Sequence, residues 1–521
     1  MSWDLERSKD RIQTHLDGMG TIEVEPLTRE ADLQNLLSET RCRDIAGTHV
    51  YFDVTNFSRL ASQDVDGDEY KRLIQGMHLY QREIGRIVSK IFDSVRVHFQ
   101  GPKLHALCYR PIRNDEKLAA RAVLLQLVLR DFVASVFNPA FPKLGNFSVA
   151  GGADLGETVG TRNGMKSDRE LLFLGAAANY AAKIILMGTL RLTEELFVAL
   201  PDDLQAICEE CEDGHYRIRS LTSQELDDLL DKYNIEWDRD VSTERINDDK
   251  QAFPLSSIEY SEATALIDLD SLSIRNNKRV LAASIYADVT GFTAYVDGAR
   301  GTDREEEALR VFHAIRLEMA RVVRDDFHAL RIQFQGDRLQ GLLHMPKDDE
   351  EAIAMQAVEI AAALQASFEL AIKACLPEAG PLHLAVGIDL GRTLVSKLGT
   401  HAHRDRICLG EAVQQAAECE EGIGGEEIGI TKTIYDLLPA DVRAKFTFRA
   451  GARCYVAAKL RTDILDAIRR AREYDSNKPV AIGTTSSGAT TIRPASAATA
   501  ASSLILPSRP FACDEDNHDT A

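Results

Sequence analysis

The sequence predicts an α+β fold, an α/β sandwich that occurs twice in one chain, with the two copies packed as an internal pseudo-dimer. In each half, apolar alternation and helical spacing indicate strand, helix, strand, helix, strand. A chain of 521 residues with 45% apolar residues can form two or three cores. One offset of 235 positions also separates a series of paired landmarks: Asp53 and Asp288, Gly101 and Gly336, Asp154 and Asp389, Gly156 and Gly391, Gly175 and Gly410. Agreement in one register over such a span indicates a duplicated domain.

The first copy is expected to begin with a strand and a turn at 49–57. Apolar spacing from Leu73 to Ile91 predicts an amphipathic helix over 69–93, and alternation over 95–101 predicts a strand. The later elements are expected in this order: a helix at 115–137, a strand at 147–150 and a helix at 179–187.

Composition sets the expected boundaries. The chain divides into an N-terminal helical segment (1–45), a first domain (46–221), an acidic linker with short helices (222–278), a second domain (279–475) and a disordered tail rich in Ser, Thr, Ala and Pro (476–521). The repeated Gly-x-Asp-Leu-Gly segments, at Asp154 and Asp389, are assigned to turns.

The net charge of −20 argues against a protein that coats nucleic acid, since Lys and Arg carry that binding. The sequence has no apolar run long enough for a membrane span and no signal-peptide core, so the cytoplasm is the expected location. The nine cysteines are scattered and are expected to be reduced thiols.

Two carboxylates of the second copy follow predicted strands. Asp288 ends one strand, and Asp337 follows Gly336 at the turn after another. If the strands are neighbours, both carboxylates project at one edge of the sheet. Two hard oxygen ligands with open positions suit Mg²⁺ or Mn²⁺ and a phosphate substrate. By composition alone, ordinary turn residues are the favoured interpretation of both.

Three motifs resemble those of the class III nucleotidyl cyclase domain. They are the stretch 288–293 (Asp-Val-Thr-Gly-Phe-Thr), the Gly336-Asp337 turn and the stretch 175–183. The resemblance covers about 45–200 and 280–440. It implies two ferredoxin-like domains that form a head-to-tail pair, with the active site between them.

The resemblance gives the second copy the metal-binding and phosphate-binding roles. It implies metal positions at Asp288, Val289 and Asp337, which would hold two Mg²⁺ or Mn²⁺ ions, and nucleotide contacts at Val289, Gly291, Phe292 and Thr293. The helix of this copy, however, has Gln414 and Glu418 where the family has Asn and Arg.

The first copy shows the complementary pattern. It keeps Asp53 but has Pro102 in place of the second Asp and Asn56 in place of the turn Gly. Its helix keeps Asn179, with Lys183 in place of Arg, one helical turn further on. One composite site is therefore expected, with Asp288, Asp337, Asn179 and Lys183 as catalytic residues, and the opposite pairing is expected to be dead.

The base-recognition positions of the first copy are His98 and Leu172, which fit neither the adenine nor the guanine pattern of the family. The tandem layout is similar to the pyrimidine cyclases of bacterial antiphage defence. This implies conversion of UTP to cyclic UMP (CTP to cyclic CMP remains open), a separate effector protein that responds to the product, and a possible homodimer. His98 could instead be a plain strand residue. An adenylate or guanylate cyclase with an unusual pocket and an inactive nucleotide-sensing module remain open.

Overall fold

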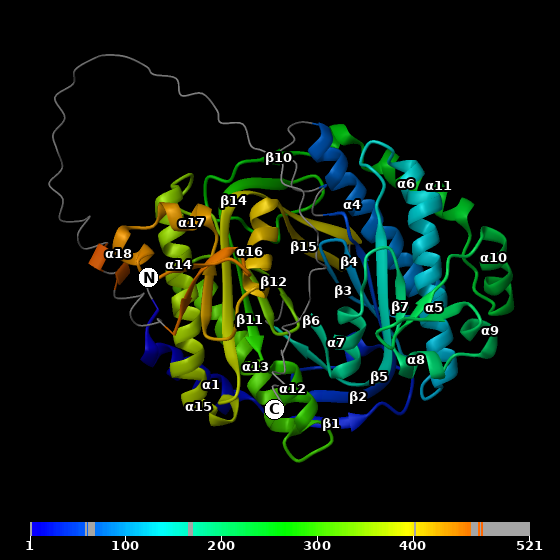
Figure 1. Ribbon diagram of the computed structural model, residues 1–521, viewed down its shortest axis with the longest axis horizontal. Helices are drawn as coiled ribbons and strands as arrows, with labels where there is room; N and C mark the ends of the chain where they lie inside the picture. The colour runs from blue at the N-terminus through cyan, green and yellow to red at the C-terminus, as the bar shows by residue number, and fades with distance from the viewer. Residues whose placement is uncertain are drawn as a thin grey trace.

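Two mixed sheets face each other across the molecule, and each carries its own helices on its outer side (Figure 1). The computed structural model describes residues 3–57, 60, 68–164, 170–400, 403–459, 467–468 and 470–471. The predicted tail at 476–521 lies outside the described residues. Each sheet contains nine strands of the described chain.

The first copy carries its sheet in the order β3-β4-β2-β5-β7-β9-β8, with β1 beside β2 and β6 beside β5. Its strands are β1 (Glu23–Pro26), β2 (Arg41–Val54), β3 (Val95–Gln100), β4 (Lys103–Cys108), β5 (Val149–Asn163), β6 (Glu170–Leu174), β7 (Leu190–Leu192), β8 (Cys208–Glu210) and β9 (Tyr216–Ile218). Its helices, with the segment before it, are α1 (Leu5–Gly18), α2 (Leu33–Leu36), α4 (Asp68–Arg86), η1 (Ile87–Ile91), α5 (Asp115–Asp131), η2 (Phe132–Phe137), α6 (Asn138–Ala140), α7 (Ala176–Lys183), α8 (Glu194–Val198) and α9 (Asp202–Gln205).

The second copy has the matching order β12-β13-β11-β14-β16-β18-β17, with β10 beside β11 and β15 beside β14. Its strands are β10 (Tyr260–Ser261), β11 (Asn277–Thr290), β12 (Leu330–Gln335), β13 (Arg338–Leu343), β14 (His383–Thr400), β15 (His403–Leu409), β16 (Glu427–Ile430), β17 (Thr447–Arg449) and β18 (Cys454–Ala458). Its helices are α12 (Phe292–Ala299), α13 (Glu305–Arg321), η4 (Val322–Asp326), α14 (Glu350–Ala366), η5 (Ser367–Ile372), α15 (Lys373–Cys375), η6 (Pro377–Ala379), α16 (Glu411–Glu421), α17 (Lys432–Leu437) and α18 (Ala440–Arg443).

The two copies share strand register and helix caps. Thr48 pairs with Cys108 in the first sheet, and the equivalent Ala283 pairs with Leu343 in the second. The N–H groups that begin α5 and α14 are capped by Asn114 and Asp349, which also stand 235 positions apart. The duplication read from the sequence is therefore a duplication of structure.

The assignment of Asp154 and Asp389 to turns was wrong, because both lie inside the long strands β5 and β14. Each buried carboxylate accepts a hydrogen bond from a threonine hydroxyl, Thr193 for Asp154 at 2.5 Å and Thr431 for Asp389. Burial raises the pKa of both to about 6. The glycines around each Asp allow the close approach of helices α7 and α16, which the sequence motif could not distinguish from a turn.

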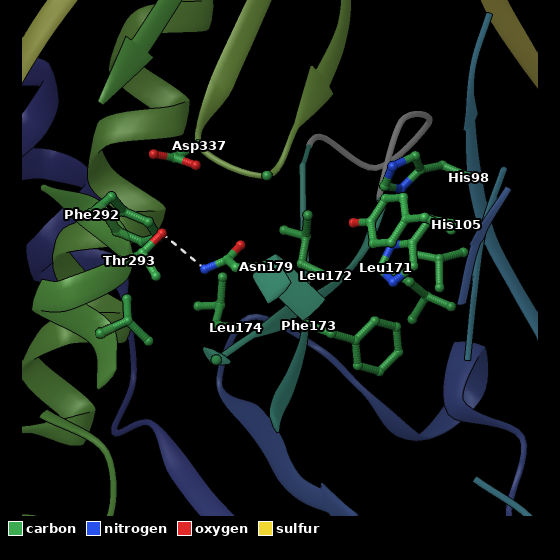
Figure 2. A pocket seen from close by; sticks show the side chains of 15 residues that line it. His98, His105, Leu171, Leu172, Phe173, Leu174, Asn179, Phe292, Thr293 and Asp337 are labelled. Carbon is green, nitrogen blue, oxygen red and sulfur yellow. Dashed lines mark hydrogen bonds between the residues drawn. The ribbon is translucent and has the colours of Figure 1, made fainter. Parts of the chain in front are cut away.

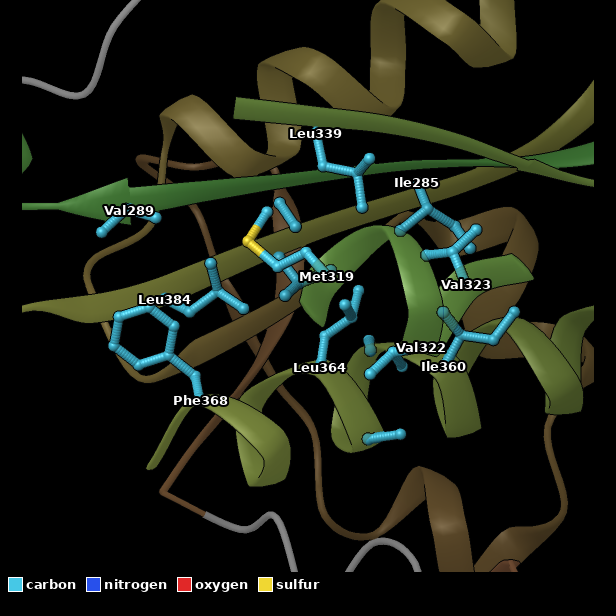
Figure 3. Packing of buried hydrophobic residues seen from close by; sticks show 14 of the residues in the cluster. Ile285, Val289, Met319, Val322, Val323, Leu339, Ile360, Leu364, Phe368 and Leu384 are labelled. Atoms are coloured by element: carbon cyan, nitrogen blue, oxygen red, sulfur yellow. The ribbon is translucent and has the colours of Figure 1, made fainter. Parts of the chain in front are cut away.

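Alternation along β11 places its side chains on two faces of the strand. Ile285 and Val289 enter a core built with Met319 and Leu364 from the outer helices (Figure 3). Fully burying one such side chain contributes roughly 1.5–3 kcal/mol. The alternate residues Tyr286 and Asp288 lie on the opposite face of the strand, where Tyr286 packs with Val395 and with Ala416 of α16.

A pair of equivalent salt bridges joins the copies head to tail. Arg96 of β3 binds Asp405 of β15, and Arg331 of β12 binds Glu170 of β6 at 3.1 Å. Arg96 and Arg331 are equivalent, as are Glu170 and Asp405. Each copy therefore gives the same arginine to the same acidic position of the other, as expected for a pseudo-twofold pair.

The flanking segments are part of the packed structure. Helix α1 lies against the second copy, where Arg11 binds Glu318 at 2.5 Å and Asp326 at 2.9 Å (Figure 1). Residues 222–278, predicted to be a linker, form α10 (Ser223–Lys232), α11 (Arg239–Ala252), η3 (Leu255–Ser257) and β10. Helix α11 packs on the first copy through Asp249, which binds Arg82 at 2.8 Å. Among the described residues, no helix is long and apolar enough to cross a membrane.

Candidate active site

A pocket lies between the two copies, and Figure 2 shows its two ends. One end is lined by Phe292, Thr293 and Asp337 of the second copy. The other is lined by the first copy, with His98 and Leu172 among its residues. The structure therefore brings together most of the residues that the sequence assigned to one composite site.

Asp288 and Asp337 form a buried carboxylate pair. Asp288 is 1% exposed near the end of β11, and Asp337 is 4% exposed in the turn between β12 and β13. Burial raises the pKa of Asp337 well above its usual range, and the charge of Asp288 raises it further. Two carboxylates held together in a buried site favour either a proton or a cation between them.

The donor set fits hard divalent ions. Asp288 and Asp337 supply buried carboxylate oxygens, and Asp337 lines the pocket. The adjacent Arg338 is bound to Glu420 at 2.5 Å and to Glu421 at 3.1 Å, so its positive charge is already paired with two carboxylates. The residues of this end therefore suit a hard divalent cation.

Arg316 is a site residue that sequence reasoning missed. It is 1% exposed in α13, donates to the carbonyl of Gly336 and binds Glu170 of the first copy at 2.5 Å. Its guanidinium also lies 4.1 Å from the centre of the Phe334 ring. Arg316 thus fixes the turn that carries Asp337. An arginine on an otherwise apolar helix face was the available signal.

The phosphate turn is built on Gly291. Its φ of 84° lies in the left-handed region that favours glycine, and it caps the N-terminus of α12. Thr293, in the first turn of that helix, accepts a hydrogen bond from Asn179 Nδ2 of the first copy at 2.8 Å. The side chain of Val289 lies in the core, so any contact to a ligand would come from its backbone.

Lys183 stands at the sequence position of the family's arginine, but its side chain does not line the pocket. It is exposed at the end of α7 and is not among the residues that line the pocket. Asn179, one turn earlier, is 8% exposed and lines it. The structure therefore brings Asn179 into the site and leaves Lys183 at its margin.

The far end of the pocket holds the predicted His98 and Leu172 together with two residues that the sequence interpretation did not include, Tyr51 and His105. His98 lines this end, and its Nε2 lies 2.9 Å from Gln100 Nε2. Tyr51 and His105 line it as well, on the neighbouring strands β2 and β4. A search for paired histidines in adjacent strands would have found His105. Leu172 supplies an apolar wall.

The equivalent position on the opposite side differs in charge. Lys103 Nζ lies 3.4 Å from Asp53 Oδ2, and both side chains are largely buried. On the facing helix α16, Gln414 donates to Glu418 at 2.6 Å. Pro102 thus stands at the position of Asp337, and the ammonium of Lys103 lies beside the single carboxylate. The equivalent Arg338 instead binds Glu420 and Glu421.

A further acidic cluster lies outside the pocket. Glu369, His383 and Glu426 bring potential ligand atoms within 4.8 Å of one another. Lys373 binds Glu369 at 2.8 Å, and Lys459 binds Glu426 at 3.1 Å. The two lysines already balance these carboxylates, so the cluster is no better suited to a metal than to its present ion pairs.

The fold and the composite pocket define the class: the chain is a class III nucleotidyl cyclase with both domains in one polypeptide. It is similar to a class III adenylyl cyclase-like ATP-binding protein from Pseudomonas aeruginosa, with a TM-score of 0.77 and 27% identity over 90% of this chain and all of that one. No family model matches the chain.

Sequence relatives define the family more narrowly. The chain is 30% identical over 462 residues to a uridylate cyclase of Pseudomonas aeruginosa, which covers 85% of this chain and 88% of that protein. It is 26% identical over 428 residues to a uridylate cyclase of a Rhizobium species, over 77% and 80% of the two chains. The chain belongs to the uridylate cyclase family.

Proposed function

We propose that the composite pocket converts UTP to cyclic UMP and pyrophosphate. The observation that carries the proposal is the hydrogen bond from Asn179 to Thr293, because it joins the helix of one copy to the phosphate turn of the other inside one pocket. The names of the relatives, uridylate cyclases in two organisms, support uracil as the base.

The reaction needs an in-line displacement at the α-phosphorus. The ribose 3′-oxygen forms the new bond, the bond to the bridging oxygen of the β-phosphate breaks, pyrophosphate leaves and the hydroxyl proton passes to solvent. Two Mg²⁺ or Mn²⁺ ions held at Asp288, Val289 and Asp337 would neutralise the triphosphate and make the 3′-hydroxyl more acidic.

The residues of the chain bind and orient the substrate. Phe292 and Thr293 receive the phosphates at the start of α12, where helix N–H groups favour an anion. Asn179 orients the ribose, and Lys183 attracts phosphate from the margin of the pocket. His98 and Leu172 enclose the base. A role in antiphage defence, a separate effector and a homodimer remain predictions from the resemblance.

A purine cyclase is the second candidate, because the solved relative is described as ATP-binding. The test incubates the purified chain with Mn²⁺ or Mg²⁺ and each of the four ribonucleoside triphosphates and identifies the products by mass. We expect cyclic UMP from UTP. Product from ATP or GTP alone would overturn the pyrimidine assignment, and no cyclic product from any nucleotide would overturn the enzymatic function.

A further inference from the structure

The far end of the pocket, where His98 and Leu172 would enclose the base, is called the base end. It contains buried polar atoms without hydrogen-bond partners among the described residues. His105 is 3% exposed and lines the pocket, and its Nδ1 has no hydrogen-bond partner there. The ring of Tyr51 stacks on His105 at a centroid distance of 4.2 Å, and its buried hydroxyl also has no hydrogen-bond partner among the described residues. Because buried polar groups normally have partners, these atoms indicate that a ligand completes them.

His105 is the last member of a chain of hydrogen bonds. Its Nε2 lies 2.9 Å from Nδ1 of His49, and Nε2 of His49 lies 3.1 Å from the hydroxyl of Thr158. His49 and Thr158 are fully buried in β2 and β5. Three strands of the first sheet therefore link a threonine in the interior to a nitrogen at the pocket.

Both imidazoles are neutral at pH 7. Burial lowers the pKa of His49 to about 3 and holds that of His105 well below its usual range. Each ring then carries one proton, so the chain of hydrogen bonds has two directions. In one, Nδ1 of His105 is an N–H donor toward the pocket, and in the other it is an acceptor.

The hydroxyl of Thr158 decides between these directions. Among the described residues, the contact with His49 is the one hydrogen bond that this hydroxyl makes, and Thr158 is fully buried. If Thr158 accepted from His49, its own hydrogen would be left without an acceptor in the described part of the chain, which is unfavourable. Thr158 therefore donates to His49, His49 donates to His105, and Nδ1 of His105 carries a proton.

The second copy has kept the threonine but not the histidines. Thr393 is equivalent to Thr158 and is also fully buried, whereas Ser284 and Gln340 stand in place of His49 and His105. The relay thus occurs in the copy that lines the base end of the composite pocket. Strand packing alone does not require it, since the second copy forms the same strands without it.

We propose that Thr158 and His49 are positioning residues that fix the tautomer of His105, and that His105 Nδ1–H donates to the 4-oxygen of uracil. The proposal rests on the proposed function. Cytosine has an amino donor at that position, so two donors would face each other in a buried site. The relay therefore selects UTP over CTP.

The test replaces Thr158 by Val, which keeps the side-chain shape and removes the hydroxyl. We expect the ratio of kcat/KM for UTP to that for CTP to fall by about tenfold or more, since the tautomer of His105 is no longer fixed. Thr393→Val is the matched control, and we expect it to leave the ratio unchanged. Equilibrium binding of UTP and CTP to each variant gives the same comparison without turnover.

The second measurement is made on the wild-type chain. Nitrogen NMR of labelled histidines is expected to show Nδ1 protonated in both His49 and His105, and Nε2 protonated in both would overturn the relay. A Thr158→Val variant that makes cyclic UMP with the wild-type preference would overturn the relay and leave the proposed function intact. A chain that makes no cyclic product, but whose binding preference for UTP falls in Thr158→Val, would overturn the proposed function and support the relay.

Discussion

The two equivalent sites between the copies share one backbone frame but balance their charges in different ways. In the composite site, Asp288 and Asp337 are both buried, and each raises the cost of ionising the other. In the opposite site, Pro102 replaces the second carboxylate and Lys103 binds Asp53 at 3.4 Å. The composite pair thus favours a bound proton or cation, whereas the single carboxylate of the opposite site is already paired with Lys103.

The helices α7 and α16 also differ in whether their polar side chains bond across the interface between the copies. Asn179 of α7 reaches across the interface to Thr293, whereas Gln414 of α16 donates within its own helix to Glu418. The phosphate turn also changed, because Asn56 binds the loop of its own copy at Asn146 and Ser148. Duplication thus preserved the fold in both copies, and a few side chains decide which side can bind a triphosphate.

Replacing each carboxylate by an amide tests directly whether the two sites differ in function. Asp337→Asn should lower cyclic nucleotide formation by about 10³-fold or more, because it removes a metal ligand. At pH 7 it should keep or raise the free energy of unfolding, since the pKa of Asp337 is raised and its ionised form is unfavourable in the fold. Mass spectrometry of products and urea denaturation measure the two effects.

Asp53→Asn is the matched control for that experiment. It should leave most activity, because the opposite site lacks the second carboxylate and has Lys103 in place. Complete loss of activity in Asp53→Asn, with the fold intact, would contradict the assignment of a single working site.

The helix residues give the next effect. Asn179→Ala should lower kcat/KM by about 10²-fold, as expected when one preorganised hydrogen-bond donor is removed. Gln414→Ala, at the equivalent position of the other copy, should stay within a few-fold of wild type, since its hydrogen bond is internal to α16. Equal losses in both variants, measured with UTP and Mn²⁺, would show that both helices serve the reaction.

A smaller effect, on stability, is expected at Lys103. Lys103→Met leaves the carboxylate of Asp53 without this buried partner and should cost about 1–3 kcal/mol of unfolding free energy. The double variant with Asp53→Asn should recover much of that loss. If urea denaturation finds the two single changes additive, the ion pair does not stabilise the opposite site.

Much of the fold followed from the sequence because the two copies could be compared. The offset shared by Asp53 and Asp288 gave the duplication, and apolar spacing gave the helices at 69–93 and 115–137, which correspond to α4 with η1 and to α5 with η2. The strand expected at 147–150 extends to Asn163, because its glycines looked like a turn although they serve close helix packing.

The composite site was predictable only in part. Motif residues such as Asp337 and Asn179 have fixed positions in the resemblance, and the pocket brings them together. Arg316 and His105 carry no motif, since their roles depend on which strands and helices of different copies meet. Lys183 matched a motif position, but its exposure depends on where α7 ends, and the sequence pattern placed that end at residue 187.

A pH dependence of stability is also expected to differ between the copies. His49 and His105 of the first copy are buried and neutral, and their equivalents Ser284 and Gln340 do not titrate. A pKa lowered by folding means that the unfolded chain binds more protons below pH 6.5, so stability present above that pH is lost as the pH falls toward about 3. At pH 5 the loss is about 2 kcal/mol for each such histidine.

Hydrogen exchange can separate the two copies. Amides of β2 and β4 should lose more protection between pH 7 and pH 5, after correction for intrinsic exchange, than amides of the equivalent β11 and β13. Among the described residues, the second copy has two buried histidines of its own: burial lowers the pKa of His313, on α13, to about 4, and it also lowers the pKa of His344, which directly follows β13. Neither lies inside β11 or β13, so a smaller loss is expected in those strands. Equal losses in both sheets would mean that the copies unfold as one unit and that the histidines of the pocket destabilise the whole pair in acid.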